Sequence, residues 1–292
     1  IMNQYTPMAG VEKKYPEQII KKPVARSIKD QVLSLHNPAK HDYPMLRLNH
    51  KHDLSGLISW LKTIQTSATV NIHVKNCGVA LELIYIEGKL HKAITKGDGL
   101  SGRDVTVNAY CIKSIPESIK NAPGRTCIRG VVSSETIRVN SNGVATTMHG
   151  LDLKAHVSTN LIKQNPDEEY NDLVFVAHTV TNPNLTHSTW ADWSTFLRSR
   201  GFTTPKCYGC NLKAGIYEPG HWEDILDHIK ERILNSAYLP PFDGLVFSVA
   251  EMEHRYELGY TSRFPEWAIA FTPDKGFTNA PTETTSRTVS TD

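Results

Sequence analysis

The stretch VNIHVKNCGVALELIYIEGKLHKAITKGDGLSGRDVTVNAYCIKSI, residues 70–115, determines how the rest of the chain is interpreted. At its start, apolar side chains at Val70, Ile72 and Val74 alternate with polar ones. Alternation with a period of two is typical of a strand that buries one face. The stretch therefore opens with a predicted half-buried strand.

A hairpin and a glycine-rich loop follow this strand. The run from Val79 to Ile86 is rich in β-branched and apolar residues, and Glu87-Gly88 predicts a tight turn into a partner strand from Leu90 to Thr95. Three glycines then fall within residues 97–102. Such a loop lets backbone N–H groups approach a phosphate or a sugar closely.

This order of motifs resembles the adenylation (nucleotidyltransferase) domain of NAD-dependent DNA ligases. In that family a Lys-x-Asp-Gly motif ends the first strand, and a Gly-Asp-Gly loop follows the hairpin. Here Lys75-Asn76-Cys77-Gly78 and Thr95-Lys96-Gly97-Asp98-Gly99 stand at these two places. Further blocks occur in family order: His41 to Leu48, Asp243 to Val246, and Leu258 to Phe271.

The resemblance implies an α+β, ATP-grasp-like nucleotidyltransferase fold of antiparallel sheets flanked by helices. It divides the chain into an N-terminal segment, 1–45, a nucleotidyltransferase-like domain, 46–275, and a flexible polar tail, 276–292. The N-terminal segment is interpreted as the remnant of the family's helical donor-binding subdomain, whose tyrosine and aspartate pattern is not visible before Tyr15. The tail is Thr- and Ser-rich without periodicity, which is typical of a flexible segment.

Periodicity and capping signals predict the remaining elements, while residues 134–165 are expected to be less regular. The aromatic stripe that includes Trp190 and Trp193 is interpreted as core rather than as a platform for stacked bases. The predicted elements are helices after an N-cap at Asp53, over Val105–Ile112, from a cap at Ser188 to Gly201 and over His221–Leu234, and strands over Thr126–Val132, Leu173–Val180 and Leu245–Val249.

Composition excludes few classes of function. The 292 residues suffice for one large domain or two small ones, and a net charge of +2 gives no strong footprint for nucleic acid. No apolar run is long enough to span a bilayer, and five cysteines without a disulfide framework suit a reducing compartment. We expect a cytoplasmic protein, or one in the host cytoplasm if the source is viral. Cys207-x-x-Cys210 lacks a second ligand pair, so no zinc is expected.

The resemblance makes Lys75 the candidate adenylation nucleophile, and the chemistry sets demands on its surroundings. A free lysine has a pKa near 10.4, so the amine needs cationic neighbours or burial to become neutral. Positive groups or a metal ion must also stabilise the charge on the phosphate in the transition state. A simpler interpretation of Lys75, and the one we favour, is an ordinary lysine at the end of a strand.

Most positions that contact nucleotide in the family carry a different side chain here. Glycines and the loop aspartate are retained, at Gly78, Gly97 and Asp98, and so is the arginine of the Arg-Gly motif, Arg129. The substituted positions are His73 for glutamate, Cys77 for aspartate, Lys96 for arginine, Val131 for glutamate, and Ser248 and Thr272 for lysines. One such transition-state contact is worth about 3–4 kcal/mol, so several losses predict strongly weakened chemistry.

Three functional hypotheses follow. The first is a catalytically degenerate, DNA ligase-like subunit that acts in replication or repair by binding DNA, nucleotide or a partner ligase subunit. The alternative is an active NAD-dependent ligase subunit that self-adenylates Lys75 with NAD as the donor, and whose ligands would be NAD or AMP and Mg²⁺. It would seal nicked double-stranded DNA with a second chain that carries the OB and DNA-binding domains. A third is a ligand-binding protein that sequesters NAD or a related nucleotide. The chain is interpreted as an isolated module, a split subunit such as a virus or phage would use, or a truncated piece.

Overall fold

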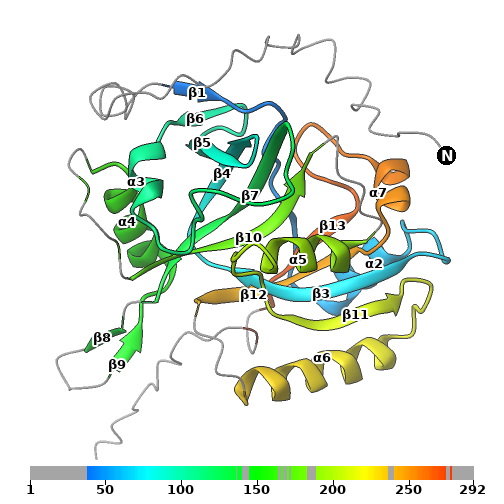
Figure 1. Ribbon diagram of the computed structural model, residues 1–292. Coiled ribbons are helices and arrows are strands. Elements are labelled where there is room, and N and C mark those ends of the chain that lie inside the picture. The colour runs from blue at the N-terminus through cyan, green and yellow to red at the C-terminus, as the bar shows by residue number, and fades with distance from the viewer. Residues whose placement is uncertain are drawn as a thin grey trace, which may run out of the picture.

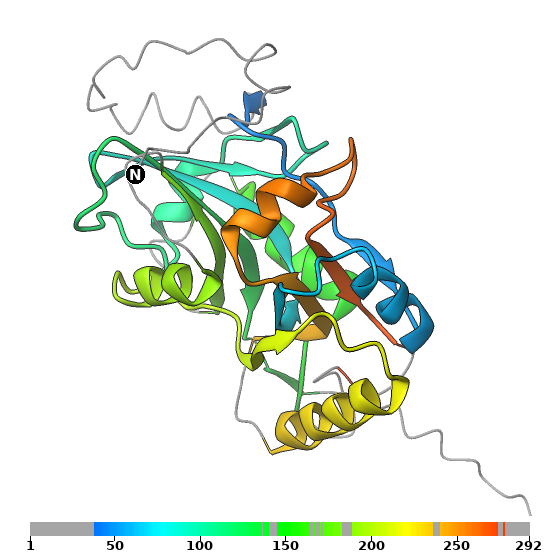
Figure 2. The ribbon, with the colours of Figure 1, turned by 90° about the vertical axis from the view of Figure 1, so that its right-hand side faces the viewer.

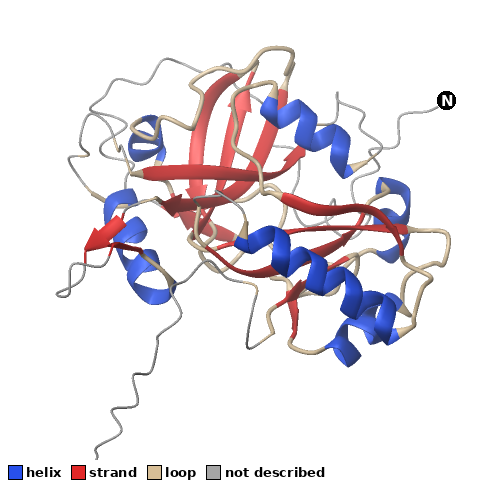
Figure 3. Cartoon of the chain, turned by 90° about the horizontal axis from the view of Figure 1, so that it is seen from below, coloured by secondary structure: helices blue, strands red, loops and turns tan. Residues whose placement is uncertain are grey.

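The computed structural model describes residues 38–135, 137–139, 145–163, 166, 170, 172–182, 189–235, 240–273 and 277, and the fold is given for these residues. Strands dominate the interior and helices lie around them (Figures 1 and 3). The strands are β1 Pro38–Lys40, β2 Asn49–Lys51, β3 Thr69–Asn76, β4 Val79–Ile86, β5 Lys89–Thr95, β6 Ser101–Arg103, β7 Arg125–Ser134, β8 Ile137–Val139, β9 Ala145–Thr147, β10 Leu173–Thr181, β11 Cys207–Lys213, β12 Phe242–Val249 and β13 Ala268–Phe271. The helices are α2 Leu54–Leu61, α3 Thr106–Tyr110, α4 Gly150–Leu161, α5 Trp190–Arg198, α6 Pro219–Leu234 and α7 Met252–Leu258.

Two sheets organise the described part of the chain. The first sheet has the order β10-β7-β4-β5, and its neighbouring strands are all antiparallel. The second has the order β11-β3-β12-β13-β2, where only the β13–β2 pair is parallel. This arrangement is the α+β architecture of antiparallel sheets with flanking helices that the sequence predicts.

Each sheet packs its own helices on its outer face. In β3, Val70, Ile72 and Val74 are buried against α2 and α6, in the same cluster as Leu61 and Trp222. The corresponding cluster of the first sheet lies against α3, α4 and α5. In Figure 2, α6 lies at the end of the molecule opposite β1. The side chains that alternate with these on each strand therefore face the space between the two sheets.

The β4–β5 hairpin turns where predicted. Glu87 and Gly88 both have positive φ, 48° and 74°, and the flanking residues Ile86 and Lys89 pair across the turn. Two central residues with positive φ define a turn whose twist matches that of the flanking strands. Gly88 adopts this backbone without a steric penalty.

Two predicted helix boundaries and one region need correction. The N-cap of α5 is Thr189, not Ser188, because the Thr189 side chain accepts from the backbone N–H of Asp192 and Asp192 reciprocates in a capping box. Helix α6 begins at Pro219, before the predicted start at His221. Residues 134–165 were predicted to be less regular, yet they contain α4. Its apolar stripe is narrow, with one buried residue per turn, so its helical period is weak.

The other predicted helices and strands in the described residues are confirmed with small shifts at their ends. Asp53 caps α2, its Oδ1 accepting from the N–H of Gly56 at 2.7 Å. The aromatic stripe of α5 is buried, as predicted for a core.

The two ends of the described chain lie against the domain. Strand β1, inside the segment 1–45, pairs with β6, with Pro38 opposite Arg103. Phe277, inside the predicted tail, is buried, and its ring lies 6.1 Å from that of Phe271. The other residues of the predicted tail, and residues 1–37, lie outside the described residues.

Candidate functional site

The strand register places several predicted site residues on the inner face of the second sheet. On β3, His73 and Lys75 alternate with the buried outer residues and so leave from the opposite face. On β12, Val246 pairs with His73 and Ser248 pairs with Asn71, so these four side chains share that face. The His178 ring of β10 meets the His73 ring at 6.2 Å, so this region lies between the two sheets.

A protein side chain covers the predicted nucleotide contact at His73. The indole of Trp190, the first residue of α5, stacks on the His73 imidazole with centroids 5.4 Å apart and an interplanar angle of 8°. Only 5% of His73 and 6% of Trp190 are exposed. Burial lowers the pKa of His73 to about 4 and that of His178 to about 3, so both imidazoles are neutral at neutral pH. The cluster is therefore aromatic and uncharged.

Polar atoms remain unpaired in this part of the interior. Nε2 of His178, Oγ of Ser248 and one terminal nitrogen of Arg255 are buried and have no hydrogen-bond partner among the described residues. Arg255 donates its Nε–H to the carbonyl of Val249 at 2.6 Å, and its guanidinium lies 4.4 Å from the Trp267 ring centroid. A buried polar group without a partner costs about 1–3 kcal/mol. Such groups in a native protein mark a place that needs a specific explanation.

Lys75, the candidate nucleophile, forms an ion pair. Its Nζ lies 2.5 Å from Oδ1 of Asp243 on β12, and 23% of the lysine side chain is exposed. Cys77 is buried, and burial together with the Asp243 carboxylate raises the pKa of its thiol to about 12. Cys77 is therefore a small buried side chain whose thiol stays protonated at neutral pH. Lys75 is thus reachable from solvent but engaged with a carboxylate.

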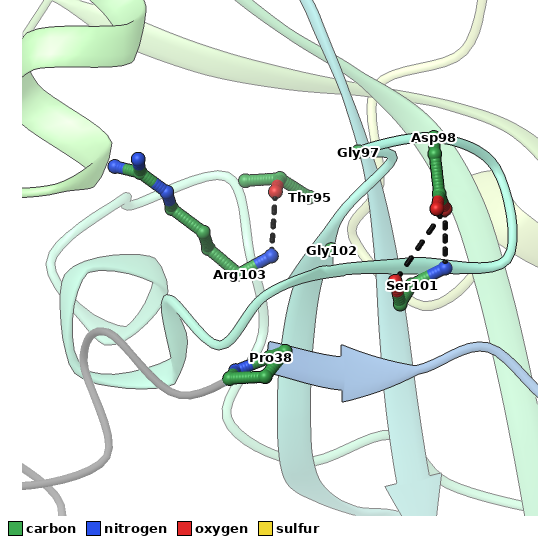
Figure 4. A pocket seen from close by; sticks show the side chains of 7 residues that line it. All are labelled: Pro38, Thr95, Gly97, Asp98, Ser101, Gly102 and Arg103. Carbon is green, nitrogen blue, oxygen red and sulfur yellow. Dashed lines mark hydrogen bonds between the residues drawn. The ribbon is translucent and has the colours of Figure 1, made fainter.

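The glycine loop holds one substituted position, Lys96, and the retained Asp98. Lys96 donates from Nζ to the carbonyl of Leu46 at 3.0 Å, and burial, then Arg47 and Arg129, lower its pKa. Asp98 accepts from the backbone N–H groups of Leu100 and Ser101 at 2.8 Å each, which holds its pKa low. Beside it lies an open hollow of about 390 Å³. In Figure 4 Asp98 and Arg103 lie on opposite sides of this hollow, which is lined by Pro38, Thr95, Gly97, Asp98, Ser101, Gly102 and Arg103.

Arg129 joins a buried ionic network with His41 and with Glu82, a residue that the sequence analysis did not single out. Its Nε donates to Oε1 of Glu82 at 2.8 Å, and Nη1 donates to the carbonyl of Pro44 at 2.9 Å. The other oxygen of Glu82 lies 2.7 Å from Nδ1 of His41. His41 lay within a quoted family block, whereas Glu82 is an acidic residue inside an apolar strand, which is itself a signal of a buried partner. Arg129 thus fastens the segment around Pro44 to the first sheet.

Two further predicted positions, Val131 and Gly78, lie side by side, because an added Cβ on Gly78 would lie 2.7 Å from Cγ1 of Val131. Val131 on β7 is half-buried and paired with Ala80 and Val176 on its two sides. At Gly78 the φ is 145°, and an added Cβ would lie 2.0 Å from the carbonyl oxygen of Val132. This position therefore requires glycine for close packing of β7, whether or not a nucleotide is present.

Thr272 stands where the family carries a lysine. Two histidines that the sequence analysis did not single out lie beside it. Nδ1 of His52 lies 2.9 Å from the carbonyl oxygen of Thr272, and Nδ1 of His50 lies 3.3 Å from its hydroxyl. Burial, followed by the charge of Lys75, lowers the pKa of His50. Within the described ranges no group of three or more His, Cys, Asp or Glu side chains is placed to hold a metal ion.

Comparison with known proteins shows which family the chain is similar to. Residues 33–274 match the family model of the NAD-dependent DNA ligase adenylation domain. The DNA ligase of Coxiella burnetii is 27% identical over 287 residues, covering 89% of this chain and 40% of the relative. The DNA ligase of Borrelia hermsii is 28% identical over 284 residues, covering 90% and 40%. The chain thus spans about 40% of the length of these relatives.

Solved structures that the chain matches share little sequence with it. The mycobacterial DNA ligase D complexed with ATP and MES has a TM-score of 0.39 at 13% identity, covering 79% of this chain and 60% of that one. An archaeal ATP-dependent RNA ligase has a TM-score of 0.43 at 12% identity, covering 79% and 48%. Separately, none of the described helices has the length and apolar character needed to cross a membrane.

Proposed function

Because the chain belongs to the family of NAD-dependent DNA ligase adenylation domains, we propose that it is a catalytically degenerate member that keeps the fold and works by binding. The site between the sheets holds the protein's own side chains where a nucleotide contact is predicted. One observation carries this proposal, the buried stack of Trp190 on His73. A ring that is stacked on His73 excludes a second ring from the same place.

The surroundings of Lys75 support the same proposal. Adenylation needs a neutral amine, and the ion pair with Asp243 must open before Nζ can attack a phosphorus atom. The positions that carry lysines in the family, Ser248 and Thr272, supply no positive charge here. Catalysis of this kind depends on fixed positive groups at the phosphate, so the rate without them is expected to be very low.

We propose that the binding role concerns DNA or a partner ligase-like subunit with OB and DNA-binding domains, in replication or repair. The test is calorimetry on the purified chain with NAD, ATP and AMP, and fluorescence anisotropy with a nicked duplex at several salt concentrations. We expect no saturable nucleotide binding and a salt-dependent association with the duplex or with the partner. Saturable binding of NAD or ATP to the unmodified chain would contradict the closed site.

A second candidate function is supported by the exposure of Lys75. Its side chain is 23% exposed, and His50 is close enough for the two charges to affect each other. An active ligase subunit, with Lys75 as nucleophile and with NAD or AMP and Mg²⁺ as ligands, would use this access. Adenylation of Lys75 in the presence of a chain that supplies the missing domains would favour it over the binding role.

A further inference from the structure

The Trp190 indole occupies a shaped place on the surface of His73. The two rings are almost parallel, at 8°, with centroids 5.4 Å apart, and both residues are more than nine-tenths buried. Parallel, offset rings at this separation are a favourable aromatic arrangement. The face of His73 therefore forms one wall of a slot that fits a flat ring.

The polar groups around this slot outnumber those that an indole can hydrogen-bond. The His178 ring meets the His73 ring from the opposite sheet in a T-shaped arrangement, with centroids 6.2 Å apart and an interplanar angle of 68°. Its Nε2 and the Oγ of Ser248 are buried without a hydrogen-bond partner among the described residues. Ser248 lies on the same face of the second sheet as His73, one strand away. An indole offers a single N–H and no acceptor nitrogen, so it leaves such groups unmet.

We propose that Trp190 is an intramolecular occupant of this slot, and that the slot binds a free bicyclic nitrogen heteroaromatic once the indole is removed. A ring with an additional acceptor nitrogen binds more tightly than indole, because it takes a hydrogen bond from the Ser248 hydroxyl. This inference rests on the proposed function, in which the site is closed, and adds what closes it and which chemical class it excludes.

The test deletes the indole and supplies it from solution. Trp190→Ala is titrated by calorimetry with indole and with benzimidazole, which share a shape and differ by one acceptor nitrogen. We expect saturable binding of both to the variant and of neither to the unmodified chain. The melting temperature of the variant should rise by about 3 °C when the ligand exceeds its dissociation constant tenfold.

Two controls make the result specific. Trp222→Ala removes the same side chain from the apolar cluster of the second sheet, where Phe247 lies against it, so we expect no preference for benzimidazole there. Adding Ser248→Ala to Trp190→Ala should weaken benzimidazole about fivefold and leave indole unchanged, which corresponds to one hydrogen bond. Equal weakening of both ligands would contradict the assigned role of Ser248.

A folded Trp190→Ala variant that binds neither ring would overturn the proposal. Should that variant not fold, Trp190→Leu is used, and both variants are refolded with and without each ring. Failure of every ring to restore native circular dichroism would likewise overturn it. The proposed function is tested separately on the unmodified chain, so a positive adenylation result there and a negative ring-binding result here are distinguishable.

Discussion

Glu82 is a fully buried carboxylate that two side chains contact. Its side chain has no exposed surface and lies between Nε of Arg129, at 2.8 Å, and Nδ1 of His41, at 2.7 Å. Burial alone would raise the pKa of this carboxyl, and the hydrogen bond from His41 and the charge of Arg129 outweigh it, so the pKa is lowered. The network ties the segment that begins at β1 to the first sheet.

Replacing Glu82 with glutamine should destabilise the fold, because the charge that compensates Arg129 is lost inside the protein. Removing one partner of a buried ion pair costs about 3–5 kcal/mol. The measurement is the free energy of unfolding in urea at pH 7, with Glu231→Gln on the exposed face of α6 as the matched control. We expect the control to change stability by less than about 0.5 kcal/mol. A similar small change for Glu82→Gln would show that the network is not needed.

The same carboxyl predicts a dependence of stability on pH. Its pKa is lowered in the folded state from an ordinary 4.5, so the unfolded chain takes up the proton first as the pH falls. The stabilisation is therefore complete above about pH 4.5 and is lost as the pH falls through the folded pKa. Unfolding free energies from pH 6 to pH 3 should converge for the unmodified chain and Glu82→Gln. Parallel curves would contradict this assignment.

At the scale of elements, the glycine loop depends on close backbone approach. A Cβ on Gly102 of β6 would lie 1.5 Å from the carbonyl oxygen of Thr95, so alanine cannot be accommodated without moving β6 away from β5. Gly220 in α6 has no atom within 4 Å of such a Cβ. In thermal unfolding we expect Gly102→Ala to lower the melting temperature. Gly220→Ala should leave it unchanged or raise it slightly, because a compatible Gly→Ala change adds at most about 1 kcal/mol to the free energy of unfolding. Equal effects would refute the packing argument.

Local signals sufficed for elements whose pattern is strong. Period-two alternation predicted β3. The pair Glu87-Gly88 predicted the hairpin, because few residue pairs adopt a positive φ at two successive positions. Helix α4 was not recognised because its buried stripe, Leu153, Val157 and Leu161, has one residue per turn, and the exposed Leu151 blurs that period. The cap of α5 was misplaced by one residue, since Ser188 and Thr189 are equally good caps and only the reciprocal bond with Asp192 distinguishes them.

At the scale of the whole molecule, the stacking of Trp190 on His73 was beyond what the sequence could predict. The family blocks identified the positions of His73 and Ser248, and the substitutions there were visible. That Trp190 stacks on His73 depends on how α5 reaches across to β3, which lies more than 100 residues earlier in the chain. No local pattern encodes such a contact, so the aromatic stripe of α5 indicated only a core.

Restoring the two lysines that the family carries at Ser248 and Thr272 should change the stability of the protein by different amounts, because the two positions differ in burial. Ser248 is 2% exposed, so Ser248→Lys places an ammonium in a closed interior and should lower the free energy of unfolding by more than about 2 kcal/mol. Thr272 is only half-buried, so Thr272→Lys should be tolerated. Chemical denaturation of both variants is the measurement. A Ser248→Lys variant as stable as Thr272→Lys would show that the space between the sheets is open.

The central claim, that this member of the family does not adenylate itself, is tested most directly by intact-protein mass spectrometry. The purified chain is incubated with Mg²⁺ and either NAD or ATP, with Lys75→Ala treated in parallel. We predict no mass gain with either donor, because Trp190 closes the site and Lys75 is paired with Asp243. A gain of one AMP on the unmodified chain that is absent from Lys75→Ala would contradict the claim and establish an active adenylating subunit.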